Sequence, residues 1–331
     1  MTADLDVPCS VCALDEPLAG TAPNRRVWAI VEHPGPWGRD ALLDAPWPAP
    51  RPDLGKVLQA AFDDADIRPL LGRRVGRAGQ AAPPGQQVVL ARSGPGGWAA
   101  TLRVDAAEQL LDLPWSELRE REQSPSGQVP GWADAGRVWG ICTQGTRDAC
   151  CARLGRPLAA AFDALDPLAT WEISHSGGHR FAGVAFALPE GLVYGRVSPD
   201  DVDAMTRARA GDRVVRQLLR GAVHLSPAQQ CAEAALRDHL DDDRLAALVP
   251  ASVPVGGPGS GPLNGSAGAV TTTWEYRPDG SEPSWWQVEV IEVAIADRPA
   301  SCGKPAEPAR AWTATGVTAV PRPRTGVRIQ P

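Results

Sequence analysis

One short segment of the chain occurs twice, and this internal repeat limits the folds that the sequence can adopt. Arg26-Val-Trp-Ala-Ile30 recurs as Arg137-Val-Trp-Gly-Ile141, and an Arg-Asp-Ala tripeptide follows each copy, at 39–41 and at 147–149. Each copy is an apolar run of strand length that ends in polar, Gly or Pro residues before a helical pattern begins. The repeat therefore predicts two copies of one strand–loop–helix unit, as in α/β folds.

The residues after the second copy extend this unit. Apolar residues at helical spacing predict an amphipathic helix from Cys151 to about Leu165. Ser198 and Pro199 are typical of the first two positions of a later helix, as its cap and its first residue. Between these helices we expect three strands, at 170–174, 183–188 and 192–197. A βαβ unit followed by ββα is the order of a thioredoxin-like half, so we expect an α/β fold with two tandem thioredoxin-like halves.

The C-terminal third of the chain changes character. Residues 227–248 have a helical composition, whereas the Gly- and Pro-rich stretch that follows is typical of a flexible linker. Beyond it, Trp286, Val288 and Val290 alternate with polar residues, which predicts strands and a small β-rich appendage. The expected divisions are a degenerate N-terminal half at 1–125, a second half with the functional site at 134–250, a linker at 251–268 and a β-rich extension at 269–331.

Charge and cysteine content exclude several kinds of partner. The 331 residues include 33 Lys and Arg against 39 Asp and Glu, a net charge of -6, without a polybasic run, which disfavours nucleic-acid binding. No apolar stretch is long enough to cross a membrane and the N-terminus lacks a secretory signal, so we expect a cytoplasmic protein that binds no membrane. The seven cysteines, an odd number, should then be core residues, metal ligands or redox groups rather than disulfides.

Two cysteines and two histidines carry the strongest chemical signal. Eight residues separate Cys142 from Cys151, and three separate His175 from His179. Cys142 should end a strand, Cys151 should begin a helix and the histidines should leave the next strand, so all four lie at one end of the sheet, where ligands of α/β proteins bind. The helix N-terminus favours the thiolate that binds metal. These four residues, which we call the Cys2His2 set, are candidate metal ligands.

Other readings of the same residues stay open at this point. Taken singly, each cysteine could be a core thiol and each histidine a hydrogen-bonded loop residue. Sequence spacing alone does not decide whether Cys150 or Cys151 is the ligand. His33 is expected to bond its own loop, and Cys9-Ser-Val-Cys12 is a weak zinc signal because a second cysteine pair is missing. Cys231 and Cys302 belong to no partner pattern.

Three motifs resemble the sucrase/ferredoxin-like family of thioredoxin-like ferredoxins. They are Cys-Thr-x-Gly-x-Arg-Asp-x-Cys-Cys-Ala-x-x-Gly-Arg-Pro-Leu from Cys142, His-x-Gly-Gly-His-Arg-Phe from His175, and Glu-His-Pro-Gly-Pro-Trp-Gly-Arg-Asp-Ala from Glu32. The resemblance covers about residues 9 to 240. It implies a 2Fe-2S cluster held by two cysteines and two histidines, and the family spacing implies Cys142, Cys151, His175 and His179 as ligands. In the N-terminal copy Val31 stands where Cys142 stands, so that copy should hold no cluster.

These expectations lead to one preferred function and two alternatives. We predict one-electron transfer with an unidentified redox protein as partner, and with proton coupling through the histidine ligands. A zinc-stabilised binding module is the alternative, because zinc accepts the same donors tetrahedrally. A glycoside hydrolase, which the family label suggests, is disfavoured because no pair of carboxyls can be nominated among 39 acidic residues. We nominate no catalytic residue.

Overall fold

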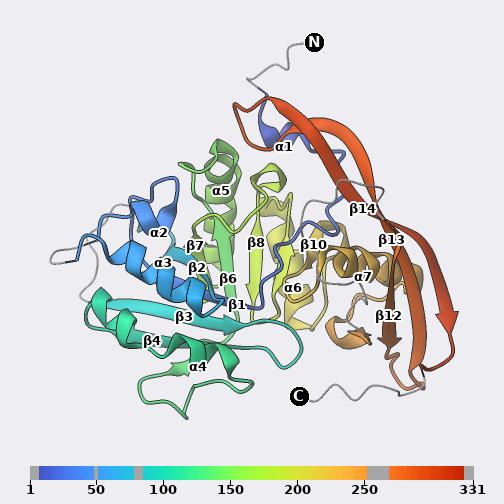
Figure 1. Cartoon of the computed structure of the whole chain (residues 1–331), viewed down its shortest axis with the longest axis horizontal. Coiled ribbons are helices and arrows are strands. Elements are labelled where there is room, and N and C mark those ends of the chain that lie inside the picture. Colours follow the sequence, from blue (N-terminus) through green and yellow to red (C-terminus); the bar gives the residue numbers. More distant parts are fainter. Residues whose placement is uncertain (1–6, 48–50, 78–84, 252–267, 324–331) are drawn as a thin grey trace.

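The computed structural model describes residues 7–47, 51–77, 85–251 and 268–323. Within these ranges the chain forms a large mixed sheet with helices packed against it and a second, antiparallel sheet made mainly by the C-terminal strands (Figure 1). The linker expected at 251–268 lies almost entirely outside the described residues. In the described ranges, every helix is too short or too polar to cross a bilayer.

Ten strands make up the large sheet. In spatial order they are Leu219–Ala222 (β10), Leu192–Tyr194 (β9), Ala185–Leu188 (β8), Val138–Cys142 (β6), Thr170–Ile173 (β7), Arg68–Arg73 (β2), Val27–Glu32 (β1), Gln86–Arg92 (β3), Trp98–Val104 (β4) and Ala133–Asp134 (β5). The smaller sheet has the order Leu248–Pro250 (β11), Val270–Tyr276 (β12), Ser284–Pro299 (β13) and Ala306–Val320 (β14).

Helices of two kinds connect and cover these strands. The α-helices are Cys9–Cys12 (α1), Ala41–Asp44 (α2), Leu54–Asp64 (α3), Trp115–Glu120 (α4), Ala149–Leu165 (α5), Val202–Ala210 (α6) and Pro227–Leu240 (α7). Short 3-10 turns occupy Ala107–Asp112 (η1), His179–Phe181 (η2), Pro199–Asp201 (η3), Arg216–Leu218 (η4) and Leu245–Ala247 (η5).

The large sheet consists of two halves with the same strand pattern. In one half β1 is parallel to β2 and antiparallel to β3, which pairs with β4. In the other, β6 is parallel to β7 and antiparallel to β8, which pairs with β9. The halves join through antiparallel β2 and β7, where Gly72 opposes Ile173. The repeated Arg-Asp-Ala tripeptides occupy equivalent places, since Asp40 and Asp148 are the cap residues of α2 and α5.

Helix α5 lies directly against the end of β6. Its N-terminus is fixed by Asp148, whose side chain accepts a hydrogen bond from the Cys150 amide at 2.9 Å. Gly155 faces the strand so closely that a Cβ atom there would lie 2.0 Å from the Cys142 carbonyl oxygen. The glycine thus permits the contact that brings the first turn of α5 beside the last residue of β6.

Two local expectations about helices have different outcomes. The start at Ser198 is confirmed, because the Ser198 amide and hydroxyl both bond the Asp201 carboxylate before α6 begins. The expectation of helix through residue 248 is wrong: α7 ends at Leu240. Asp241 takes a left-handed φ of 51°, and the chain turns from there toward β11.

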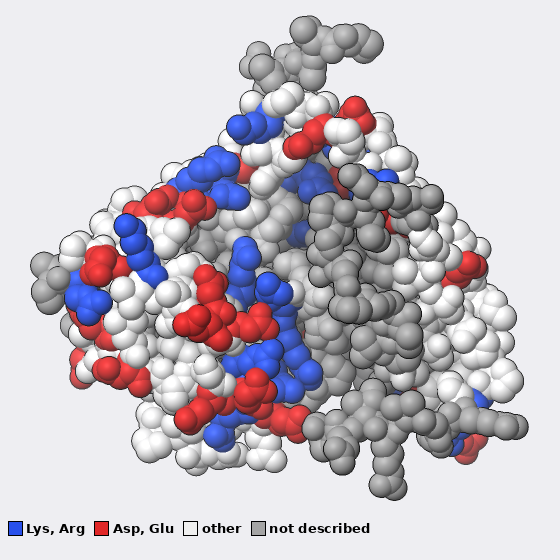
Figure 2. Space-filling model, in the orientation of Figure 1, with Lys and Arg blue, Asp and Glu red and all other residues white. Residues whose placement is uncertain are grey.

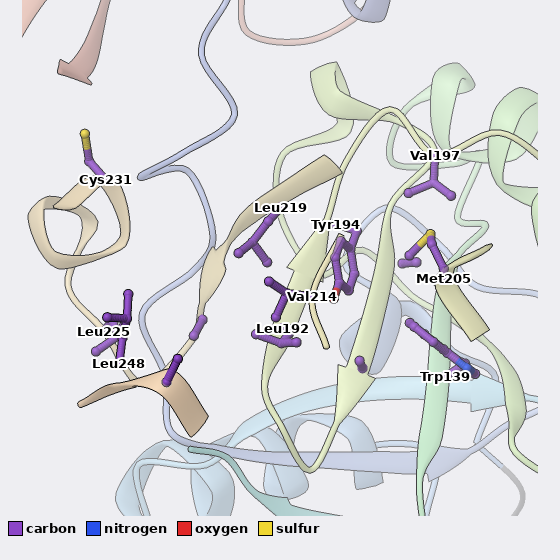
Figure 3. Close-up of a cluster of buried hydrophobic side chains, with 14 of the residues drawn as sticks. Trp139, Leu192, Tyr194, Val197, Met205, Val214, Leu219, Leu225, Cys231 and Leu248 are labelled. Atoms are coloured by element: carbon purple, nitrogen blue, oxygen red, sulfur yellow. The ribbon is translucent and has the colours of Figure 1, made fainter. Parts of the chain in front are cut away.

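The C-terminal strands share a hydrophobic core with the second half of the large sheet. Trp274, Val288 and Val290 are buried in the same cluster as Trp139 of β6 and Tyr194 of β9. Figure 3 shows part of this cluster, including Trp139 of β6, Leu192 and Tyr194 of β9 and Cys231 of α7. Helix α7 lies between the two sheets and contacts β12, β13 and β14. The C-terminal sheet is therefore part of the core packing.

Candidate metal centre

The Cys2His2 set lies at one end of the second half of the large sheet. Cys142 is the last residue of β6, and Cys151 lies in the first turn of α5. His175 follows β7 after one intervening residue, and His179 begins η2. Both thiols are buried, whereas His175 is partly exposed. The strand-end placement expected from the sequence is what the structure shows.

Two of the thiols and one imidazole form a compact group. His175 Nδ1 lies 3.9 Å from Cys142 Sγ and 3.8 Å from Cys151 Sγ, and all three atoms lie within 4.8 Å of one another. A hydrogen bond from the Cys151 thiol, helped by His175, lowers the pKa of Cys142. The same proton sharing and burial raise the pKa of Cys151. The two sulfurs therefore share a proton, which a metal ion would displace.

His179 lies beside this group without joining its shortest contacts. Its ring centroid is 4.9 Å from that of His175, and its Nε2 hydrogen-bonds the carbonyl oxygen of Ala300 in the turn between β13 and β14. Its Nδ1 is buried and has no hydrogen-bond partner among the described residues. Burial and the neighbouring His175 lower the pKa of His179, which favours the neutral imidazole that binds metal. The unpartnered Nδ1 is the feature that a bound metal would satisfy.

The loop that carries the histidines is held from both sides. Gly177 and Gly178 have φ values of 111° and 74°, which side chains rarely adopt, and they turn the chain between the two imidazoles. On one side the His175 amide donates to Gln144 Oε1 at 2.7 Å, and the Gln144 side-chain nitrogen bonds the Gly38 carbonyl in the first half. The first half thus helps to position a histidine of the second.

Arg220, on the other side of the loop, is a site residue that sequence reasoning missed. Its guanidinium donates to the Gly177 carbonyl at 2.9 Å and lies over the Phe181 ring. The side chain is fully buried and forms no ion pair with a carboxylate of the described residues. Burial lowers the pKa of Arg220 to about 9, so the group stays charged at neutral pH. A lone arginine in the short strand β10 gives no sequence signal, because only the fold brings it to the histidine loop.

A cavity of about 290 Å³ reaches His175 from the surface. Arginines of both halves line it, among them Arg39, Arg68 and Arg147, together with acidic residues of the first half. On the face drawn in Figure 2, basic and acidic side chains are likewise interspersed. His175 is therefore the member of the Cys2His2 set that a molecule entering this cavity would meet.

The remaining sequence candidates are His33 and the five cysteines outside the Cys2His2 set. His33 is buried and bonds its own loop, since its Nδ1 accepts from the Gly35 amide at 3.0 Å. Cys150 points away from Cys151 and lies 3.3 Å from Cys302 and 3.8 Å from Cys9, measured between sulfurs. Cys302 shows no partner pattern in the sequence because its two neighbours in the structure, Cys9 and Cys150, are remote from it along the chain. Cys12 and Cys231 do not belong to either group of donors.

The arrangement as a whole suits the binding of a metal: buried thiols, an imidazole that contacts both, and a second imidazole with a free nitrogen. Comparison with known proteins adds one finding. A family model described as sucrase/ferredoxin-like matches residues 18–221, more than half of the chain. No curated protein and no solved structure matches.

Proposed function

This chain belongs to the sucrase/ferredoxin-like family, and we propose that it is an electron-transfer protein with a 2Fe-2S cluster at the Cys2His2 set. The observation that carries the proposal is the unpartnered, buried Nδ1 of His179 beside two thiols that share the imidazole of His175. Such a cluster supplies reversible one-electron transfer. The chain's own residues provide its ligands, its charge environment and its separation from water.

On the thiol side of the site, Cys142 is favoured in the anionic form that a metal requires, whereas Cys151 keeps the proton that the two sulfurs share. Cys151 lies in the first turn of α5, where the helix dipole stabilises negative charge. The hydrogen bond and the neighbouring imidazole already lower the pKa of Cys142. Loss of the shared proton to solvent would leave both sulfurs free to bind iron.

The histidine side sets the charge of the site. Two neutral imidazoles add no negative charge, so a centre held by this set accepts an electron more readily than one held by four thiolates. The buried guanidinium of Arg220, which bonds the histidine loop, favours the reduced state further because that state is more negative. The Nε2 proton of His179 is held by the Ala300 carbonyl. Proton coupling would therefore run through His175, whose ring borders the cavity.

Three further proposals accompany the electron-transfer function. The identical strand pattern of the two halves supports a pair of thioredoxin-like halves, of which the first has Val31 in place of Cys142 and is structural. All seven cysteines are free, which supports a cytoplasmic location. The partner is another redox protein that approaches at the cavity beside His175, because electron transfer requires a short path.

Metal analysis of anaerobically purified protein tests the main proposal. We expect a red-brown preparation with about two irons and two acid-labile sulfides per chain. The reduced protein should give a paramagnetic resonance signal that contains nitrogen couplings from two histidines. A colourless protein from iron-supplied cells with zinc bound to the Cys2His2 set would contradict the proposal and favour the zinc-binding module, for which the short His175–thiol distances are also suitable.

A further inference from the structure

A second group of metal donors lies next to the Cys2His2 set. We name it the three-thiol cluster, and its members are Cys9, Cys150, Cys302 and the carboxylate of Asp148. The donor atoms lie within 4.8 Å of one another. They come from three places in the chain: helix α1, the N-terminus of α5 and the turn between β13 and β14 (Figure 1).

We propose that the three-thiol cluster binds one zinc ion, which ties the N-terminal segment and the C-terminal hairpin to helix α5. This site is distinct from the Cys2His2 set, and the proposal does not depend on the presence of an iron–sulfur cluster.

The distances between the sulfurs fit a single tetrahedral ion. They are 3.3 Å between Cys150 and Cys302, 3.6 Å between Cys9 and Cys302, and 3.8 Å between Cys9 and Cys150. With Zn–S bonds of about 2.3 Å, tetrahedral geometry separates two sulfur ligands by about 3.8 Å. An Asp148 oxygen lies 3.2 Å from Cys302 Sγ and 3.6 Å from Cys9 Sγ, so the carboxylate occupies the fourth corner.

Hydrogen bonds around the cluster hold its members in place. Asp148 Oδ2 accepts from the Cys302 amide at 2.8 Å and from the Ser301 hydroxyl at 2.9 Å. The Cys9 amide donates to Cys302 Sγ at 3.4 Å, and Ser10 Oγ lies 3.2 Å from Cys150 Sγ. Donors to sulfur and to the outer carboxylate oxygen are typical of the groups that support metal ligands.

The three-thiol cluster is largely buried, and ion pairs hold the surrounding segments together. Cys9, Cys150 and Asp148 are buried, and Cys302 is half-buried. Nearby, Arg298 of β13 bonds Asp15 at 3.0 Å, and Arg180 bonds Glu16 at 2.7 Å, so ion pairs fix the segment after α1 to both neighbours. Zinc is the ion that such a closed, thiol-rich tetrahedral site selects, because all four positions are filled by protein. Its binding releases to solvent the protons that the thiols still carry.

The experiment measures zinc and iron separately in the full-length protein, purified without chelators from cells supplied with both metals. We expect about one zinc per chain in the wild type, and a loss of at least roughly tenfold in Cys9→Ser and in Cys302→Ser. Cys12→Ser is the matched control, because it alters the other cysteine of the same Cys-x2-Cys pair and should keep its zinc. Cys142→Ser should also keep zinc while losing iron.

Cobalt provides a second measurement, which begins with the wild-type protein. Wild-type protein reconstituted with Co²⁺ alone should show tetrahedral visible bands and thiolate-to-cobalt charge transfer. Cys302→Ser should lower the charge-transfer intensity of the three-thiol cluster by about one third, which is about one fifth of the total where the two thiols of the Cys2His2 set also bind cobalt. Zinc that is absent from the wild type, or that follows Cys142 rather than Cys9 and Cys302, would overturn the proposal. So would a Cys150–Cys302 disulfide found by mass spectrometry of the native protein.

Discussion

Two neighbouring residues, Cys150 and Cys151, serve different sites because of helix geometry. Successive residues of an α-helix point about 100° apart, so the two thiols leave the first turn of α5 in different directions. Cys151 faces Cys142 and His175, whereas Cys150 faces Cys9 and Cys302. Each of these two adjacent cysteines therefore belongs to a different group of metal donors.

Serine substitution at each of these cysteines separates the two roles. Cys151→Ser should lose at least roughly tenfold in bound iron, because a serine hydroxyl is a far poorer ligand than a thiolate. Cys150→Ser should keep most of its iron and lose zinc. Iron, sulfide and zinc measured on the same anaerobic samples check this. The ligand assignment would be wrong if Cys150→Ser lost its iron and Cys151→Ser stayed coloured.

Arg220 is expected to tune the redox potential through its charge. Arg220→Gln removes a buried positive charge that favours the reduced state, so the midpoint potential should fall by roughly 50 mV, which is about 1 kcal/mol for one electron. Arg220→Lys keeps the charge and is the control for loss of packing. Potentiometric titration of all three proteins provides the measurement, and equal potentials in wild type and Arg220→Gln would rule out this role.

At the scale of elements, the site depends on how closely helix α5 approaches strand β6. Their contact places Cys151 beside Cys142, and Gly155 is the residue that allows it. The pairing of β6 with β7 brings the histidines to the same place. The two strands are parallel and Cys142 pairs with Ile173, so the loop that follows β7 begins beside Cys142. Strand ends that lie side by side deliver ligands from separate segments to one place.

Gly155→Ala should therefore harm both stability and metal binding. The added Cβ would lie 2.0 Å from the Cys142 carbonyl oxygen, so the helix must move away from the strand. We expect the free energy of unfolding to fall by about 1–3 kcal/mol and iron occupancy to fall with it. Gly316→Ala is the control, because a Cβ at Gly316 meets no atom within 4 Å. Denaturant unfolding and iron analysis test both variants, and unchanged values for Gly155→Ala would contradict the packing argument.

At the scale of the whole molecule, the C-terminal sheet stabilises the half that contains the site. Its strands pack on α7, and its β13–β14 turn brings Ala300 to His179 and Cys302 to the three-thiol cluster. The extension thus contributes both to the hydrophobic core and to the surroundings of the ligands.

Trp274 is the residue that tests this dependence. Its side chain is 1% exposed within the cluster shared with Trp139, so Trp274→Ala should lower the free energy of unfolding by about 3–5 kcal/mol. Leu168→Ala, at a residue that is 83% exposed, should change it by less than about 0.5 kcal/mol. Urea denaturation followed by fluorescence and by circular dichroism supplies both values. A small effect at Trp274 would mean that the C-terminal sheet is an independent appendage.

The sequence by itself determined the local features of this protein. The internal repeat indicated two similar units because apolar periodicity and helix-start residues act over a few residues, and β1 and β6 occupy equivalent places in the two halves. For the same reason Ser198 could be identified as a helix cap, and Cys142, Cys151 and His175 could be placed at strand and helix ends.

Only the tertiary structure decided which distant segments meet. Cys9 and Cys302 are 293 residues apart, and no spacing rule links them, yet the packing of the C-terminal hairpin on α1 brings their sulfurs to 3.6 Å. Arg220 reaches the histidine loop through the pairing of β10 with β9. Contacts of this kind arise from the burial of whole faces of helices and sheets, which depends on all of the segments that pack together and leaves no pattern in any one of them.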